Sequence, residues 1–185
     1  CSSDLLMDIL PNYIKNIDRK CFSTTIFVCL FIMSGLYVGA NFQHRAENCL
    51  EIKTQRGSVL SRSVEEGING QNLISYIEEN IPSDKSIWVI PEGIMINFLT
   101  KHESFDKHFG LLPFNVTSDG EENIISDLEK TSPDYIVEAE RNMFEYGKAG
   151  LGLDYGIKIA EYIRQNYTLE KTFHEAGSNF RIWRK

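Results

Sequence analysis

The feature that most constrains this chain is an uncharged, mostly apolar stretch of 19 residues from Phe22 to Ala40. About 20 apolar residues span the hydrocarbon core of a bilayer as an α-helix, and hydroxyl side chains in such a helix can bond to its backbone. Gly35 and Gly39 have the spacing of small residues found where membrane helices pack. The stretch therefore predicts a transmembrane helix over residues 21–41. A buried helix of a soluble protein is the alternative, although few such helices lack a polar face over this length.

The charges on either side of this span predict its orientation in the lipid bilayer. Lys15, Arg19 and Lys20 precede the span, and fewer basic residues follow it. Positive charge favours the cytoplasmic side. We therefore expect residues 1–20 to be a cytoplasmic or interfacial segment and residues 42–185 to form an extracytoplasmic domain.

The first residues allow more than one interpretation. Asp4 to Ile17 has an amphipathic pattern, which fits the end of an earlier membrane helix or a helix that lies on the membrane surface. The chain begins with Cys1, so we expect a fragment or a processed chain. The run Cys1-Ser2-Ser3 also resembles the start of a mature bacterial lipoprotein. Beyond the span there is one cysteine, Cys49, which predicts that the outer domain has no internal disulfide.

Short apolar segments alternate with amphipathic segments in the outer domain. This alternation predicts an α/β fold, in which helices cover a parallel or mixed sheet in a small three-layer-like domain with a C-terminal hairpin. The net charge of −7, with no block rich in Lys or Arg, argues against a nucleic-acid partner. The residues expected in strands are 50–54, 87–90, 135–137, 169–174 and 180–183, and those expected in helices are 72–80, 93–101, a segment that begins with a capping box at 118–121, and a segment that opens at Gly152 or Asp154.

Six motifs of the outer domain form an ordered series: Trp88 to Gly93, Ile96 to Leu99, Pro133 to Val137, Tyr146-Gly147, Gly152-x-Asp154-Tyr155-Gly156 and Tyr162-Ile163-x-x-Asn166-Tyr167. The series resembles the C-terminal extracytoplasmic region of bacterial multi-pass glycosyltransferases that are similar to the dolichyl-phosphate-mannose–protein mannosyltransferases of the GT-C superfamily. The resemblance covers about residues 15 to 185.

The resemblance implies a membrane enzyme with many spans, which moves a sugar from a polyprenyl-phosphate carrier to an acceptor at the outer face. This chain would be the last span and the outer domain of that enzyme in the bacterial inner (cytoplasmic) membrane, with upstream membrane helices of the same protein as partners. The catalytic acids of the family lie in a loop after the first membrane helix, to which no stretch here corresponds. We therefore assign no catalytic residue and no cofactor to this chain, and we expect it to be inactive alone. The alternative is a single-span, membrane-anchored domain that binds a ligand or a protein and has no enzymatic activity.

Four residues are candidates for contact with a glycan, a lipid-linked sugar or another ligand. Glu92 and Asn97 follow an apolar strand, and Asp154 and Tyr155 lie in a glycine-rich loop. Glu92 has a second interpretation, in which its carboxylate stabilises a helix N-terminus. Tyr155 also has a second interpretation, in which its ring packs on the sheet. A phosphate-binding turn needs several glycines, whereas Pro91-Glu92-Gly93 has one glycine and an acidic side chain that repels phosphate.

A histidine-containing segment, Lys101 to His108, raises the question of a metal site. His102, Asp106 and His108 could coordinate a metal, but the segment has no HExxH motif and two lysines interrupt the cluster. We interpret it as a solvated helix end and expect no metal site. No combination of Ser or Cys with His and Asp suggests a nucleophilic enzyme.

Overall fold

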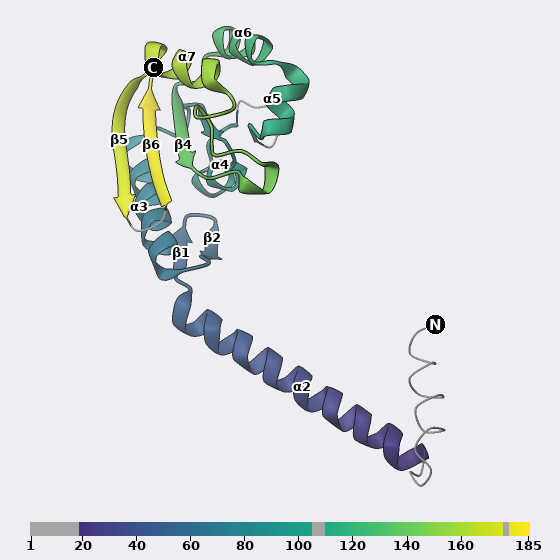
Figure 1. The fold of residues 1–185 in the computed structure, drawn as a ribbon. Coiled ribbons are helices and arrows are strands. Elements are labelled where there is room, and N and C mark those ends of the chain that lie inside the picture. Colours follow the sequence, from purple (N-terminus) through teal and green to yellow (C-terminus); the bar gives the residue numbers. More distant parts are fainter. Residues whose placement is uncertain (1–18, 105–109, 176–177) are drawn as a thin grey trace. The chain divides into compact units, whose positions relative to one another are not determined.

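The computed structural model describes residues 19–104, 110–175 and 178–185 (Figure 1). The chain divides into two units after Asn48. In the described residues the first unit is one long helix, α2 (Arg19–Asn48). The second unit, from Cys49 onward, contains all the strands of the described residues.

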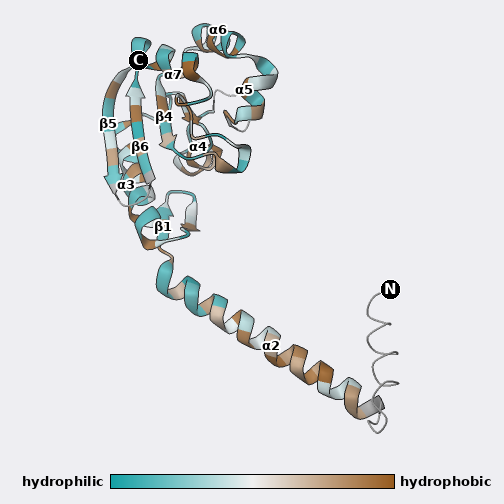
Figure 2. Cartoon of the chain, viewed as in Figure 1, coloured by the Kyte–Doolittle hydropathy of each residue, from teal (hydrophilic) through white to brown (hydrophobic). Residues whose placement is uncertain are grey.

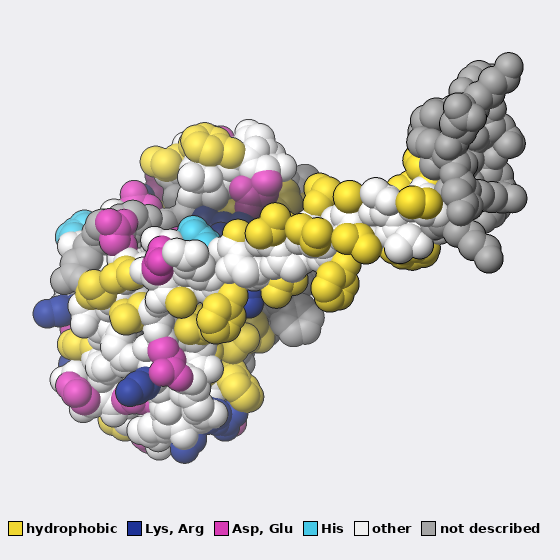
Figure 3. Space-filling view, turned by 90° about the horizontal axis from the view of Figure 1, so that it is seen from below, with side chains coloured by type: hydrophobic (Ala, Val, Ile, Leu, Met, Phe, Trp, Pro, Cys, Tyr) yellow, Lys and Arg dark blue, Asp and Glu magenta, His cyan; other side chains and the backbone are white. Residues whose placement is uncertain are grey.

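Helix α2 is, by length and composition, the one helix of the described residues that could cross a membrane. Its apolar side chains are exposed along the helix (Figure 3). Apolar residues are concentrated in its N-terminal half and hydrophilic residues near its C-terminal end (Figure 2). The helix ends at residue 48 rather than at the predicted residue 41. Its 30 residues give a length of about 45 Å, which exceeds a hydrocarbon core of about 30 Å, so a membrane would leave its polar last turns outside the apolar layer.

The second unit is an α/β domain with a mixed sheet, as the sequence predicted. Its four-stranded sheet has the order β3-β4-β6-β5, in which β3 and β4 are parallel and the other neighbours are antiparallel. The elements are β1 (Glu51–Thr54), β2 (Gly57–Leu60), α3 (Val64–Asn80), β3 (Ile87–Ile90), α4 (Ile94–Thr100), α5 (Pro113–Asp119), α6 (Glu121–Thr131), β4 (Tyr135–Glu140), the 3-10 helix η1 (Phe144–Tyr146), α7 (Ile157–Asn166), β5 (Thr168–Glu175) and β6 (Ser178–Arg184).

Two apolar clusters, one on each face of the sheet, make up the core. Trp88 and Ile136 pack with residues of α5, α6 and α7 on one face, and Val89 and Val137 pack with α3 on the other. Alternate residues of each strand therefore enter different clusters, as the pleat of a strand requires. The result is three layers, with the sheet between two sets of helices.

Strand β3 lies at an edge of the sheet. All four of its residues are nevertheless buried. The backbone N–H of Ile87 donates to the carbonyl of Glu103 at 3.2 Å, and the side-chain amide of Asn97 donates to the carbonyl of Ile87 at 2.8 Å. These bonds occupy edge groups that would otherwise lack partners, which explains how a fully apolar strand can stand at an edge.

The predicted capping box at 118–121 is wrong. Ser118 lies inside α5, and the N-cap of α6 is Gly120, which has no side chain to accept a hydrogen bond. The Glu121 carboxylate instead accepts the backbone N–H groups of Lys158 and Ile159, at 2.7 and 3.2 Å. Glu121 thus serves the first turn of α7, a contact across 37 residues that local sequence spacing does not reveal.

Candidate functional site

The carboxyl ends of β3 and β4 lie side by side, because the two strands are parallel and paired from Ile87–Tyr135 to Ile90–Glu138. In open α/β sheets, ligands bind in the crevice outside these ends. Pro91-Glu92-Gly93 follows β3, and Arg141 and Asn142 follow β4. This edge is therefore the first place to look for a site.

An ion-pair chain joins the two strand ends. The carboxylate of Glu92 pairs with the guanidinium of Arg141, which also pairs with the carboxylate of Glu145. All three side chains are less than half exposed, at 41%, 44% and 43%. The turn after β3 is fixed as well, since the carbonyl of Pro91 accepts the N–H of Leu111. Glu92 is thus held by an arginine directly after the neighbouring strand β4, a partner that sequence analysis did not identify.

A cleft of about 560 Å³ opens at this edge. We call it the carboxyl-edge cleft. Its polar wall contains both hydrogen-bond acceptors and hydrogen-bond donors, and apolar side chains line another part of the cleft. The residues important here are Glu92, Arg141, Asn142 and Glu145 on the polar side, and Ile96 and Phe180 on the apolar side.

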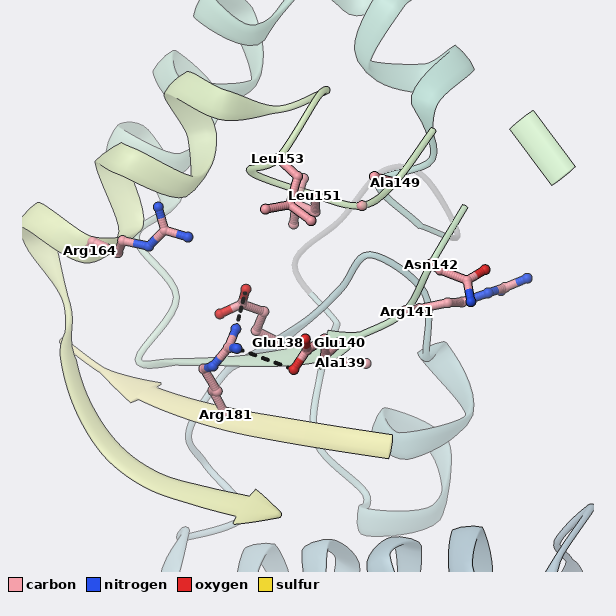
Figure 4. Close-up of a pocket in the computed structure, with 11 residues that line it drawn as sticks. Glu138, Ala139, Glu140, Arg141, Asn142, Ala149, Leu151, Leu153, Arg164 and Arg181 are labelled. Carbon is pink, nitrogen blue, oxygen red and sulfur yellow. Dashed lines mark hydrogen bonds and ion pairs between the residues drawn. The ribbon is translucent and has the colours of Figure 1, made fainter. Parts of the chain in front are cut away.

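A second cavity of about 210 Å³ adjoins the cleft, because residues 139–142 line both. We call it the arginine cavity. It lies between the end of β4, the loop of residues 149–153 and helix α7 (Figure 4). Arg181 on β6 donates to Glu138 at 3.0 Å and to Glu140 at 3.3 Å. The other oxygen of the buried Glu138 accepts the indole N–H of Trp183 at 2.9 Å.

Asp154, one of the predicted residues, organises the loop that forms one wall of the arginine cavity. Its carboxylate accepts the backbone N–H groups of Ala149 and Gly150, at distances of 2.9 to 3.2 Å. These bonds, led by the one from Ala149, hold the pKa of the Asp154 carboxyl below its ordinary value. The side chain is exposed, but its oxygens face the loop backbone. Asp154 therefore fixes the backbone of the loop that lines the cavity, and its own side chain does not line the cavity.

Asn97 and Tyr155, the other two predicted residues, are buried in the domain. Asn97 uses its amide group on the carbonyls of Ile87 and Glu103. The ring of Tyr155 packs in the apolar cluster with α5, α6 and α7, and burial raises the pKa of its hydroxyl to about 12. Of the four predicted residues, the structure thus places Glu92 in the cleft and Asp154 behind the cavity wall, while neither Asn97 nor Tyr155 lines the cleft or the cavity.

The histidine segment gives no metal centre in the part that the structure describes. His102 is buried, and its ring nitrogens lie 3.1 Å from the hydroxyl of Thr100 and 3.2 Å from the carbonyl of Pro82. Asp106 and His108 lie outside the described residues. No three His, Cys, Asp or Glu side chains of the described ranges come close enough together to hold a metal ion.

The fold and the site define the class of protein: an α/β domain with a polar cleft at the carboxyl edge of its parallel strands, in a chain that also has a helix able to cross a membrane. Comparisons with protein-family models, curated proteins and solved structures found no significant match.

Proposed function

We propose that this chain is the C-terminal, non-catalytic portion of an integral membrane glycosyltransferase, and that its outer domain positions the acceptor. The donor would be a sugar linked to polyprenyl phosphate. One observation supports this proposal above all: motifs that resemble the family and lie far apart in the sequence converge at one edge of the sheet. Glu92 lines the carboxyl-edge cleft, and the loop that Asp154 organises lines the adjoining cavity.

The chemistry of the cleft suits a sugar. Sugar hydroxyl groups both donate and accept hydrogen bonds, so they need carboxylates and donors close together. Glu92 and Glu145 supply acceptors, and Arg141 and Asn142 supply donors. Phe180 adds an apolar face against which the C–H side of a sugar ring can lie. Such a surface binds a polar, uncharged ring better than a large apolar ligand.

The membrane context fits the same proposal. Helix α2 would be the last span of the enzyme in the bacterial inner membrane. The basic residues before it, such as Lys15, favour a cytoplasmic N-terminal side and an outer domain beyond the membrane. The partners would be the lipid bilayer, upstream membrane helices of the same protein, and a glycan or lipid-linked sugar.

Reading the gene upstream of the Cys1 codon tests the transferase proposal. We expect an open frame with further hydrophobic spans and acidic residues in the first outer loop. A start site immediately before this codon would overturn the proposal in favour of a single-span binding domain without enzymatic activity.

Saturation-transfer difference NMR on the full chain in lipid nanodiscs tests the cleft. The probes are the methyl glycosides of mannose, glucose and N-acetylglucosamine. We expect a signal from at least one probe, an affinity about tenfold weaker in Glu92→Gln, and no change in Glu129→Gln, which removes an exposed carboxylate outside the cleft. Equal affinity in wild type and Glu92→Gln, or silence with all three probes, would show that the cleft does not hold the sugar.

A further inference from the structure

The arginine cavity contains a cation that no described carboxylate neutralises. Arg164, near the end of α7, lines the cavity. Its side chain extends from the helix toward the space between Leu151 and Arg181 (Figure 4). In the described ranges its guanidinium has neither an ion pair nor a hydrogen bond. All five of its N–H donors are therefore free for a ligand.

The other charged groups of the cavity are already engaged. Arg181 is fixed by Glu138 and Glu140. Both oxygens of Glu138 are in use, one by Arg181 and the other by Trp183. Arg141 is paired on the side of the carboxyl-edge cleft with Glu92 and Glu145. An anion entering the cavity would therefore find one unpaired charged group, the guanidinium of Arg164.

A glycine leaves room for this guanidinium. Gly152 has a φ of +74°, a left-handed conformation that favours glycine. A Cβ atom at this position would lie 3.3 Å from Nη2 of Arg164 and 2.7 Å from Cβ of Ala160. The loop can thus approach α7 closely without covering the guanidinium. Leu151 and Leu153 line the same space. Arg164 is exposed, so a ligand can reach its guanidinium from solvent.

We propose that the arginine cavity is a phosphate-binding subsite in which Arg164 holds the phosphate oxygens. A guanidinium presents a planar fork of donors that matches phosphate in two parallel hydrogen bonds. The volume of about 210 Å³ corresponds to about seven water molecules, so a phosphate fits together with part of the group it esterifies. The subsite stands on its own geometry. It is also distinct from the cleft, because Leu151 of the cavity packs on the face of the sheet that α7 covers, whereas Ile96 and Phe180 of the cleft pack on the face that α3 covers.

The test is isothermal titration calorimetry on the full chain in phosphatidylcholine nanodiscs at low salt, with inorganic phosphate, glucose 1-phosphate and acetate as probes. We expect phosphate binding that weakens about tenfold or more in Arg164→Gln, and by less in Arg164→Lys, which keeps the charge but loses the fork. Arg184→Gln is the matched control, because this exposed arginine on β6 lies outside the cavity. Equal affinity in Arg164→Gln and wild type, an equal loss in Arg184→Gln, or acetate binding as tight as phosphate would overturn the inference.

A second arm identifies the source of the phosphate. The same variants are titrated with nanodiscs that contain polyprenyl phosphate. Arg164-dependent binding of the soluble probes assigns the subsite to a free phosphate ester, and Arg164-dependent binding of the lipid alone assigns it to a lipid-borne phosphate. No binding in either arm rejects the subsite. Glu92→Gln separates the two proposals, because we expect it to weaken sugar binding in the cleft and to leave inorganic phosphate binding unchanged.

Discussion

Individual polar residues at the carboxyl edge have two different tasks: some hold the backbone, and others face the cleft. Asn97 belongs to the first kind, since its buried amide satisfies the carbonyl of Ile87 on the edge strand. We expect Asn97→Ala to lower the free energy of unfolding by about 1–3 kcal/mol, because it leaves that buried carbonyl without its partner. Urea unfolding followed by tryptophan fluorescence measures the change. Glu92→Gln, at a partly exposed cleft residue, is the comparison and should cost less. Equal stability of Asn97→Ala and wild type would contradict the structural role.

Asp134 predicts how one part of the stability depends on pH. Its carboxylate accepts the backbone N–H and the hydroxyl of Ser86 and the ammonium of Lys85, each at 3.0 Å. The N–H of Ser86 is the main cause that lowers the pKa of this carboxyl from its ordinary value of 3.8. A lowered pKa in the folded state means stability that is present above about pH 4 and is lost as the pH falls through the folded pKa.

We therefore expect the difference in unfolding free energy between wild type and Asp134→Asn to be constant near neutral pH and to shrink below pH 4. The side chain is 38% exposed, so solvent screening keeps the ionic part of the difference below about 1 kcal/mol. Denaturant unfolding of both proteins from pH 7 to pH 3 measures it. Parallel curves over that range would show that the ionised form of Asp134 is not favoured by folding.

The secondary-structure elements that the sequence predicted are those whose pattern is local. The runs 87–90 and 135–137 and the C-terminal hairpin are present in the structure. Helix α5 was not predicted, although Pro113 lies in its first turn, a position to which proline is well suited. Strand β2 was missed because four residues with mixed exposure give little periodicity.

The site was predicted only in part, because a local sequence pattern marks only some of its residues. Glu92 follows an apolar strand directly, which made it visible in the sequence. Arg181 meets Glu138 only through the pairing of β4 with β6, across 43 residues. Arg164 lines the cavity because α7 packs closely against the loop that contains Gly152. These residues become candidates only when strand register and the packing of α7 are known.

Two glycines of helix α3 test how the β1–β2 hairpin packs on it. A Cβ atom at Gly67 would lie 2.4 Å from Cβ of Leu50 and 2.7 Å from the hydroxyl oxygen of Ser61. A Cβ atom at Gly70 would meet only the side chain of Ile52, whose terminal methyl group would be 2.8 Å away. We expect Gly67→Ala to destabilise the domain by about 1–3 kcal/mol through overpacking. Gly70→Ala should be nearly neutral, because the flexible tip moves and alanine favours the helix by about 1 kcal/mol. Urea unfolding and hydrogen exchange of the hairpin amides distinguish the two variants, and equal effects would contradict this packing.

For the molecule as a whole, the orientation of the membrane span is the property on which the proposed function depends. Cys21 lies near one end of α2, and Cys49 follows the other end directly. Two variants each retain one of these cysteines and have every other cysteine changed to Ser. Labelling of each variant by a membrane-impermeant maleimide in intact bacterial cells shows on which side of the membrane its cysteine lies. Because Cys49 is half-buried, Glu47→Cys in a cysteine-free chain provides a second reporter at an exposed position of the last turn.

We expect the maleimide to label Cys49 and the residue-47 reporter in intact cells, and to label Cys21 only after the inner membrane is permeabilised. The physical reason is that the basic residues before the span favour the cytoplasmic side, while the polar end of α2 and the domain after it remain in water. The opposite pattern would place the cleft in the cytoplasm, away from polyprenyl-linked sugars at the outer face, and would remove the basis of the transferase proposal. Labelling at both ends without permeabilisation would show that α2 does not cross the membrane.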